Sequence, residues 1–108
     1  MSKWMIYLAV TLVASAVATN AFGQTGAQPR DLQARSMAAS CSGCHGTNGN
    51  AAPGMVSMAG YDKADMIKAM AEFKSGARPA TLMHQLAKGY SEVQVEAIAS
   101  YFAAQKKN

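Results

Sequence analysis

A pair of cysteines followed directly by a histidine constrains this chain more than any other feature of its sequence. The stretch reads Cys41-Ser42-Gly43-Cys44-His45. Two thiols about one helical turn apart can both form thioethers with the two vinyl groups on one edge of a porphyrin. His45 follows the second thiol and can give an imidazole nitrogen to iron. C-x-x-C-H is accordingly the attachment pattern of a c-type haem, with His45 as the proximal ligand.

Three other sites use cysteine pairs with this spacing: a disulfide, a thioredoxin-like dithiol and half of a zinc site. A zinc site needs two further ligands, and the chain offers no third cysteine and only His45 and His84 as histidines. A thioredoxin-like motif needs a βαβ context, and no stretch of the sequence is typical of a strand. The pattern therefore favours covalent haem attachment.

Residues 1–23 have the composition of a secretory signal peptide. Lys3 supplies a positive start, Met5 to Ala18 is an apolar run, and small residues follow it. The run is shorter than the roughly 20 residues that a permanent transmembrane helix needs. Cleavage is predicted after Ala21 or Gly23, with Gly23 preferred. The mature protein is then expected in the periplasm, without a membrane anchor.

The predicted mature chain, residues 24–108, is long enough for one small domain. Its side chains alone make only a marginal core, and a buried haem would add apolar mass. Export to an oxidising compartment would also drive two free thiols into a disulfide unless haem attachment used both. Without Lys3 the chain keeps nine Lys and Arg against six Asp and Glu. No basic cluster stands out, so a nucleic-acid partner is not expected.

Helical spacing of the apolar residues predicts an all-α fold of about four helices. Asp31 is expected to cap the first helix, Gly76 to stop the second, and Ser91 with Gln94 to form a capping box at the start of the last. A stretch rich in glycine and asparagine after His45 predicts an irregular bend. The four predicted helices span residues 32–40, 62–75, 81–88 and 91–105.

The ligand opposite His45 decides much of what the iron does. A methionine thioether raises the reduction potential, which suits an electron carrier. Met83, in a short segment between a proline and a glycine, is the preferred candidate, and its neighbour His84 is the main competitor. The two side chains point about 100° apart on a helix, so both cannot face the iron. Another methionine or an open sixth position also remains possible at this point, the other candidates being Met37, Met55, Met58, Met66 and Met70.

Five segments of the chain resemble a known family. They are CSGCHGTNGN at 41–50, SMAGYDK at 57–63, FKSG at 73–76, MHQLAKGY at 83–90 and IASYFAAQ at 98–105. Together they resemble a class I cytochrome c, and most closely the single-haem cytochrome subunit of flavocytochrome c sulfide dehydrogenase. The segment 83–90 points to this subgroup.

The resemblance implies a small helical fold around one haem c, with the first and last helices crossing. It implies attachment through Cys41 and Cys44, with His45 as the proximal and Met83 as the distal iron ligand. It also implies a partner, an FAD-containing flavoprotein that oxidises sulfide and passes electrons on singly. One position departs from the pattern: relatives usually carry a proline where this chain has Val56. The carbonyl that orients His45 is therefore left open.

The expected function is electron transfer, with the chain acting as a non-catalytic subunit of an oxidoreductase. A six-coordinate iron leaves no site for substrate on this chain alone. One alternative is a freestanding periplasmic shuttle, since a fold does not dictate its partner. The other is a haem-based sensor with an open sixth position.

Overall fold

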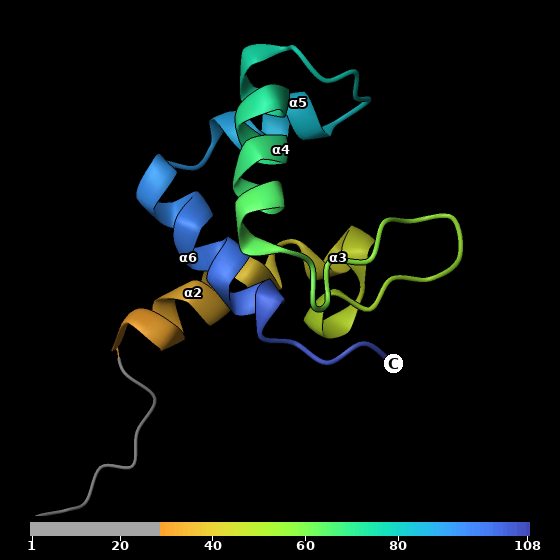
Figure 1. Cartoon of the computed structure of the whole chain (residues 1–108), viewed down its shortest axis with the longest axis vertical. Coiled ribbons are helices and arrows are strands. Elements are labelled where there is room, and N and C mark those ends of the chain that lie inside the picture. Colours follow the sequence, from red (N-terminus) through yellow and green to blue (C-terminus); the bar gives the residue numbers. More distant parts are fainter. Residues whose placement is uncertain (1–28) are drawn as a thin grey trace, which may run out of the picture.

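The structure, a computed structural model, describes residues 29–108. The predicted signal peptide and both predicted cleavage sites lie outside the described residues. This part of the chain contains helices and no strand, which confirms the predicted all-α fold (Figure 1). None of the described helices is long and apolar enough to cross a membrane. The helices are α2 (Pro29–Ala39), α3 (Ser42–His45), the 3-10 turn η1 (Thr47–Gly49), α4 (Lys63–Ser75), α5 (Met83–Lys88) and α6 (Glu92–Ala103).

All four predicted helices are present, but their ends differ from the prediction. The first begins at Pro29, so Asp31 lies inside its first turn and is not its cap. Proline is well suited to a first helical turn because the backbone N–H that it lacks would have no partner there. The negative charge of Asp31 still stabilises the helix, because it lies near the positive end of the helix dipole. In addition α5 begins at Met83 and α6 ends at Ala103, each two residues short of the prediction.

The capping signals of α4 and α6 are confirmed. The carboxylate of Asp62 accepts a hydrogen bond from the backbone N–H of Asp65 at 3.0 Å. Gly76 ends α4 in the left-handed conformation, with φ at 82°. Ser91 and Gln94 form the reciprocal capping box, with distances of 2.9 and 3.2 Å. These local contacts fix both ends of α4 and the beginning of α6.

A small core forms where α2, α4 and α6 meet. Helices α2 and α6 pack on one another, α4 packs on α6, and α5 packs on α4 (Figure 1). Phe102 is the largest fully buried side chain. Helix α4 contributes Met66, which is buried in the same cluster. The cluster is completed by Ala38, Ile98 and Ala99.

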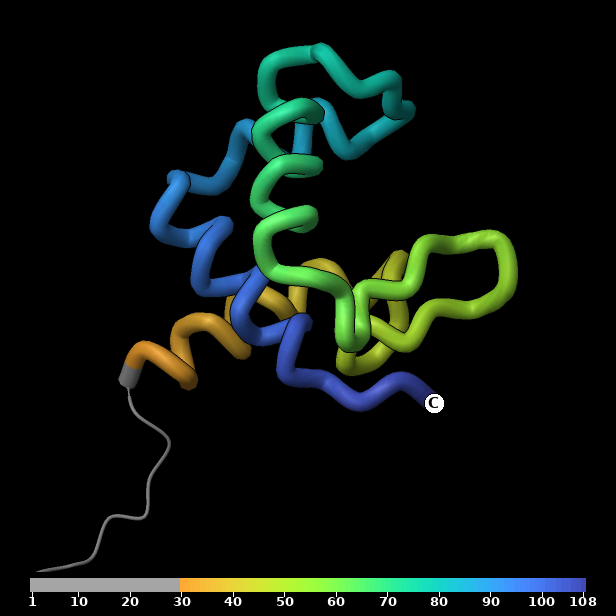
Figure 2. Tube along the Cα trace, viewed as in Figure 1, coloured from red at the N-terminus to blue at the C-terminus, as the bar shows by residue number. Residues whose placement is uncertain are grey.

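The segment between α3 and α4 projects to one side of this core, and the C-terminal residues run beneath it (Figure 2). The carbonyl of Gly49 accepts hydrogen bonds from the backbone N–H groups of Met58 and Ala59, at 2.8 and 3.1 Å. The Asn50 side chain donates to the carbonyl of Lys106 at 3.0 Å and accepts from the backbone N–H of Asn108 at 2.9 Å. The projecting segment is thus closed by its own backbone and tied to the tail.

Candidate functional site

The cysteine motif folds into a single helical turn. The backbone N–H of His45 donates to the carbonyl of Cys41 at 2.9 Å, and that of Gly46 donates to the carbonyl of Ser42 at 3.0 Å. This turn keeps both thiols and the imidazole on one short stretch of backbone. Both cysteines are free; Cys41 is half-buried and Cys44 is exposed. The motif therefore presents two unpaired thiols, as thioether attachment requires.

The environment of Cys41 affects its ionisation. Burial raises the pKa of the Cys41 thiol, and a weak contact with the Ser40 hydroxyl, 4.0 Å from the sulfur, opposes that shift only in part. A raised pKa lowers the fraction of reactive thiolate near neutral pH. Of the two thiols, the exposed Cys44 is the more accessible to a reagent.

The chain turns sharply after His45, and the turn needs glycine. Gly46 adopts φ 78° and ψ 162°, a region essentially limited to glycine. A Cβ on Gly46 would lie 1.9 Å from the carbonyl oxygen of Asn50. Two residues on, Asn48 adopts φ 55°, and its side-chain oxygen accepts a hydrogen bond from the Tyr101 hydroxyl at 2.9 Å. These constraints turn the chain back toward the imidazole of His45.

The imidazole of His45 is oriented by the backbone. Its Nδ1 lies 2.7 Å from the carbonyl oxygen of Val56. Since a carbonyl only accepts, Nδ1 carries the proton, and in the neutral ring Nε2 then has a free lone pair. This is the tautomer that a metal-ligating histidine uses. The carbonyl left open by the sequence is thus that of Val56, and the absence of a proline there does not remove the hydrogen bond.

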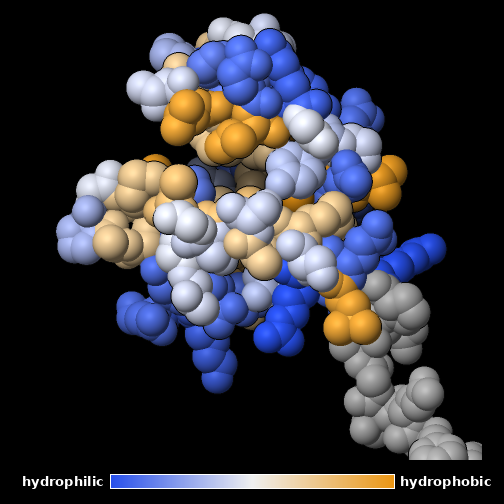
Figure 3. Space-filling model, turned by 180° about the vertical axis from the view of Figure 1, so that it is seen from behind, coloured by the Kyte–Doolittle hydropathy of each residue, from blue (hydrophilic) through white to orange (hydrophobic). Residues whose placement is uncertain are grey.

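A hollow opens between α5 and the part of the chain that contains α3. Figure 3 shows it below a group of apolar side chains in the upper part of the molecule and above the lobe formed by α3 and the projecting segment. Large apolar side chains are exposed in α5, at the N-cap residue before it, and in the projecting segment between α3 and α4. We call these four residues the apolar rim: Met55 (47 % exposed), Val56 (63 %), Leu82 (64 %) and Leu86 (53 %).

Met83 is the first residue of α5 and is half-buried. It therefore lies on the helix above the hollow, whereas His45 ends the short helix below it (Figure 1). His84 is also half-buried, and its Nδ1 is buried with no hydrogen-bond partner among the described residues. The other methionines are placed differently: Met66 is in the core, Met37 and Met58 pack against it, Met70 is half-buried on α4, and Met55 is exposed in the rim.

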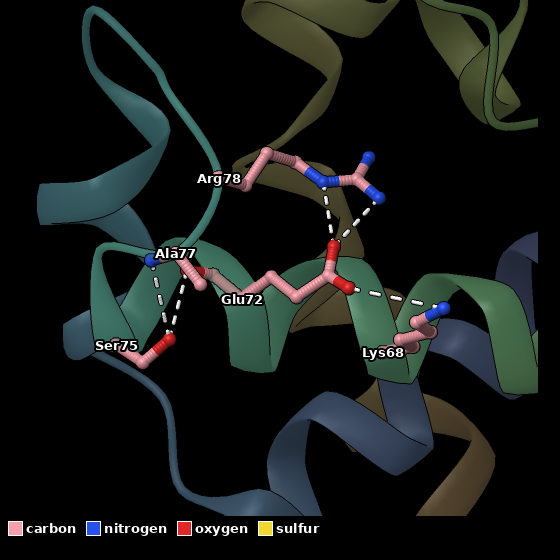
Figure 4. Close-up of polar contacts among 5 residues, drawn as sticks. All are labelled: Lys68, Glu72, Ser75, Ala77 and Arg78. Atoms are coloured by element: carbon pink, nitrogen blue, oxygen red, sulfur yellow. Dashed lines mark hydrogen bonds and ion pairs between the residues drawn. The ribbon is translucent and has the colours of Figure 1, made fainter.

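The loop that leads to Met83 is held by a polar cluster that the sequence did not reveal. The carboxylate of Glu72 on α4 accepts from Nε of Arg78 at 2.8 Å and pairs with its Nη2 at 2.7 Å (Figure 4). Lys68 approaches the other carboxylate oxygen at 3.9 Å. The guanidinium also lies 5.4 Å from the centre of the Phe73 ring. Arg78 thus fixes residues 76–78 against α4, whereas the contact of Lys68 with Glu72 lies within α4.

Comparison with known proteins identifies the family. The chain is 36 % identical, over an alignment 112 positions long, to the cytochrome subunit of sulfide dehydrogenase from Chlorobaculum tepidum, and the alignment covers 96 % of this chain and 99 % of that protein. It is also 34 % identical over 107 residues to cytochrome c4 from Pseudomonas aeruginosa, covering 98 % of this chain and 50 % of that protein. The chain is a class I c-type cytochrome. No family model matches it. Its family membership confirms the predicted function of electron transfer.

The residues of the site fit a covalently bound haem c, the cofactor of this family. The two free thiols lie on one helical turn. The hydrogen bond to Val56 leaves Nε2 of His45 free to bind iron. The hollow and the exposed apolar rim offer an apolar surface suited to a porphyrin. Nothing in this donor set conflicts with the group.

Proposed function

We propose that this chain is the electron-accepting cytochrome subunit of a flavocytochrome c sulfide dehydrogenase. The observation that carries the proposal is the extent of the similarity to the cytochrome subunit of sulfide dehydrogenase: 99 % of that protein is covered, so the two chains match in size as well as in sequence. Cytochrome c4 is matched over 50 % of its length only.

The proposal includes one haem c per chain. Cys41 and Cys44 would hold it through thioethers, His45 would bind iron through Nε2, and Met83 would bind it through its sulfur. The bound group supplies a centre that takes up and releases one electron. The contribution of the polypeptide is to orient the imidazole through the Val56 carbonyl, 2.7 Å from Nδ1. It also surrounds the centre with apolar side chains, which keep water away.

The partner is proposed to be an FAD-containing flavoprotein that oxidises sulfide. We assign the contact to the apolar rim, because four large apolar side chains exposed to water favour burial against a partner. The rim residues come from both sides of the hollow, so a partner covering them would approach the haem closely. The chain would act after export and cleavage of residues 1–23, in the periplasm.

A freestanding electron shuttle is the second candidate. The 34 % identity to cytochrome c4 supports it, because the name of that protein does not mention sulfide dehydrogenase. The two candidates differ in whether a flavoprotein stays with the chain. A stable complex is expected for the subunit, and a monomer with brief contacts is expected for the shuttle.

The test is purification of the native protein with its partners, followed by absorbance spectra. We expect a flavoprotein to co-purify and sulfide to reduce the haem within the complex. A variant, Leu86→Asp, places a charge in the apolar rim and should weaken the complex; its haem content and spectrum are recorded beside the binding, so that a loss of haem is not mistaken for a loss of the partner. A monomeric holoprotein that stays oxidised with the flavoprotein and sulfide present would reject the subunit proposal and favour the shuttle.

A further inference from the structure

Tyr90 connects two parts of the molecule that lie far apart in the sequence. It follows α5, and its half-buried side chain packs against the core. Its hydroxyl lies 2.7 Å from the hydroxyl of Ser40, the residue directly before Cys41. The bond thus joins the exit of the helix that begins with Met83 to the entrance of the cysteine motif.

The direction of this hydrogen bond follows from proton counting. The Ser40 hydroxyl lies 2.7 Å from the carbonyl oxygen of Met37, which only accepts. Serine has one hydroxyl proton, and it is used there. The Tyr90 hydroxyl therefore donates to Ser40, giving a chain from Tyr90 through Ser40 to the last turn of α2. Hydrogen bonds in such a chain polarise and strengthen one another.

The backbone of Tyr90 is held as well. Its carbonyl accepts a hydrogen bond from the ammonium group of Lys74 on α4 at 2.6 Å. A bond with a charged donor is among the stronger hydrogen bonds in proteins. Tyr90 is therefore fixed to α4 by its main chain and to α2 by its side chain.

Apart from the contacts of Arg78 with Glu72 and Phe73, the segment before Tyr90 has few other attachments. Residues 76–82 are exposed throughout, and α5 has no side-chain hydrogen bond at its N-cap residue, Leu82. Among the elements of residues 29–108, only α4 packs extensively against α5. The placement of α5 relative to the cysteine motif thus depends on contacts at the end of the segment.

We propose that Tyr90 is a positioning residue for the distal iron ligand. Its hydrogen bond to Ser40 holds α5, and Met83 with it, at a fixed distance from the attachment side of the haem. The inference rests on the proposed function, in which Met83 binds the iron. Without the Tyr90 hydroxyl, α5 can move away more readily, and an external ligand competes better with the thioether.

The experiment is a titration of the oxidised holoprotein with imidazole, followed by absorbance. Tyr90→Phe and Ser40→Ala should each raise the apparent affinity for imidazole about five-fold, the ratio that the loss of one ordinary hydrogen bond produces. The double variant should bind imidazole about as tightly as either single one, because both changes break the same bond. Ser40→Ala also provides the test if Tyr90→Phe gives no holoprotein.

Tyr101→Phe is the matched control. It removes another tyrosine hydroxyl that bonds across the molecule, to Asn48 at 2.9 Å, but does not involve α5. Its imidazole affinity should stay within about two-fold of the wild type, well below the change that one lost hydrogen bond would produce at the iron. An unchanged affinity in Tyr90→Phe and Ser40→Ala would overturn the inference. An equal increase in Tyr101→Phe would also overturn it, because the effect would then be a general loosening.

Met83→Ala separates this inference from the proposal beneath it. Loss of the distal ligand should raise the imidazole affinity far more than loss of the Tyr90 hydroxyl does. A Met83→Ala protein that binds imidazole like the wild type would refute Met83 as ligand, and the inference with it. Tight binding by Met83→Ala with no change in Tyr90→Phe refutes the positioning role alone.

Discussion

The two sides of the hollow are built in different ways. On the side of His45, the predicted ligand, the two cysteines predicted to attach haem and the residue that orients His45 all lie between positions 41 and 56, and backbone hydrogen bonds close the segment. On the side of Met83, a long exposed loop leads into a helix of six residues. That helix packs on α4, the loop before it is held by Glu72, and Tyr90 after it is held by Lys74 and Ser40.

This difference indicates which side can move. A segment closed by many short-range backbone bonds opens only at a large free-energy cost, whereas a segment held by a few side chains opens locally. We therefore expect the proximal side to determine whether the cofactor is retained. The distal side should determine the reduction potential and access to the iron.

The largest effects are expected from removing the two predicted iron ligands in turn. His45→Ala should largely abolish holoprotein, because the proximal ligand is lost from the closed side. Met83→Ala should keep the covalent haem but lower the reduction potential, within the roughly 0.8 V over which axial ligands move it. Haem content by mass analysis and potentiometric titration measure the two results. An unchanged reduction potential in Met83→Ala would contradict the expectation that the distal side determines the potential.

A smaller effect on folding should come from the turn after His45. Gly46→Ala should destabilise the holoprotein by about 3 kcal/mol or more, because the new Cβ would clash with Asn50 and the backbone conformation is limited to glycine. Gly43→Ala is the matched control. A Cβ on Gly43 would meet nothing within 4 Å, so its effect should stay within about 1 kcal/mol. Urea unfolding of the two variants compares them, and equal stabilities would contradict the assigned role of Gly46.

The smallest effect is expected from the polar cluster on the distal side. Glu72→Gln removes the ion pair with Arg78. The Glu72 side chain is 30 % exposed and the Arg78 side chain is 43 % exposed. Such pairs contribute at most about 1 kcal/mol, and the contribution falls as salt is added. Urea unfolding at low and high salt measures it. Glu96→Gln, which removes the pair with Lys63 on the α4–α6 side, is the control. If Glu72→Gln but not Glu96→Gln lowered the free energy of unfolding by well above about 1 kcal/mol, the loop would depend on this cluster more strongly than we expect.

The proximal side was also the more predictable from sequence, for the same physical reason. Spacing alone identifies Cys41, Cys44 and His45 as a unit because their chemistry depends on neighbours along the chain. The stop at Gly76 and the capping box at Ser91 were predicted correctly because the signals for a helix end are local in sequence. Asp31 was misassigned as a cap because Pro29 offered an earlier start for the helix.

The contacts that cross the molecule were not predictable in this way. The bonds from Ser40 to Tyr90 and from Tyr101 to Asn48 span 50 and 53 residues, and no periodic pattern links their members. A carbonyl that orients His45 was expected, but which residue supplies it was left open because a backbone acceptor has no side-chain signature. Met83 as distal ligand stays a prediction, supported by its place on α5.

The position of Phe102 near the end of α6 bears on how the chain is synthesised. A nascent chain that has not yet reached α6 lacks Phe102, Ile98 and Ala99, which make up most of the buried cluster. The preceding helices are short and marginally stable without tertiary packing. Compact folding must therefore wait until translation has passed residue 102. Until then the polypeptide remains open, with both thiols accessible.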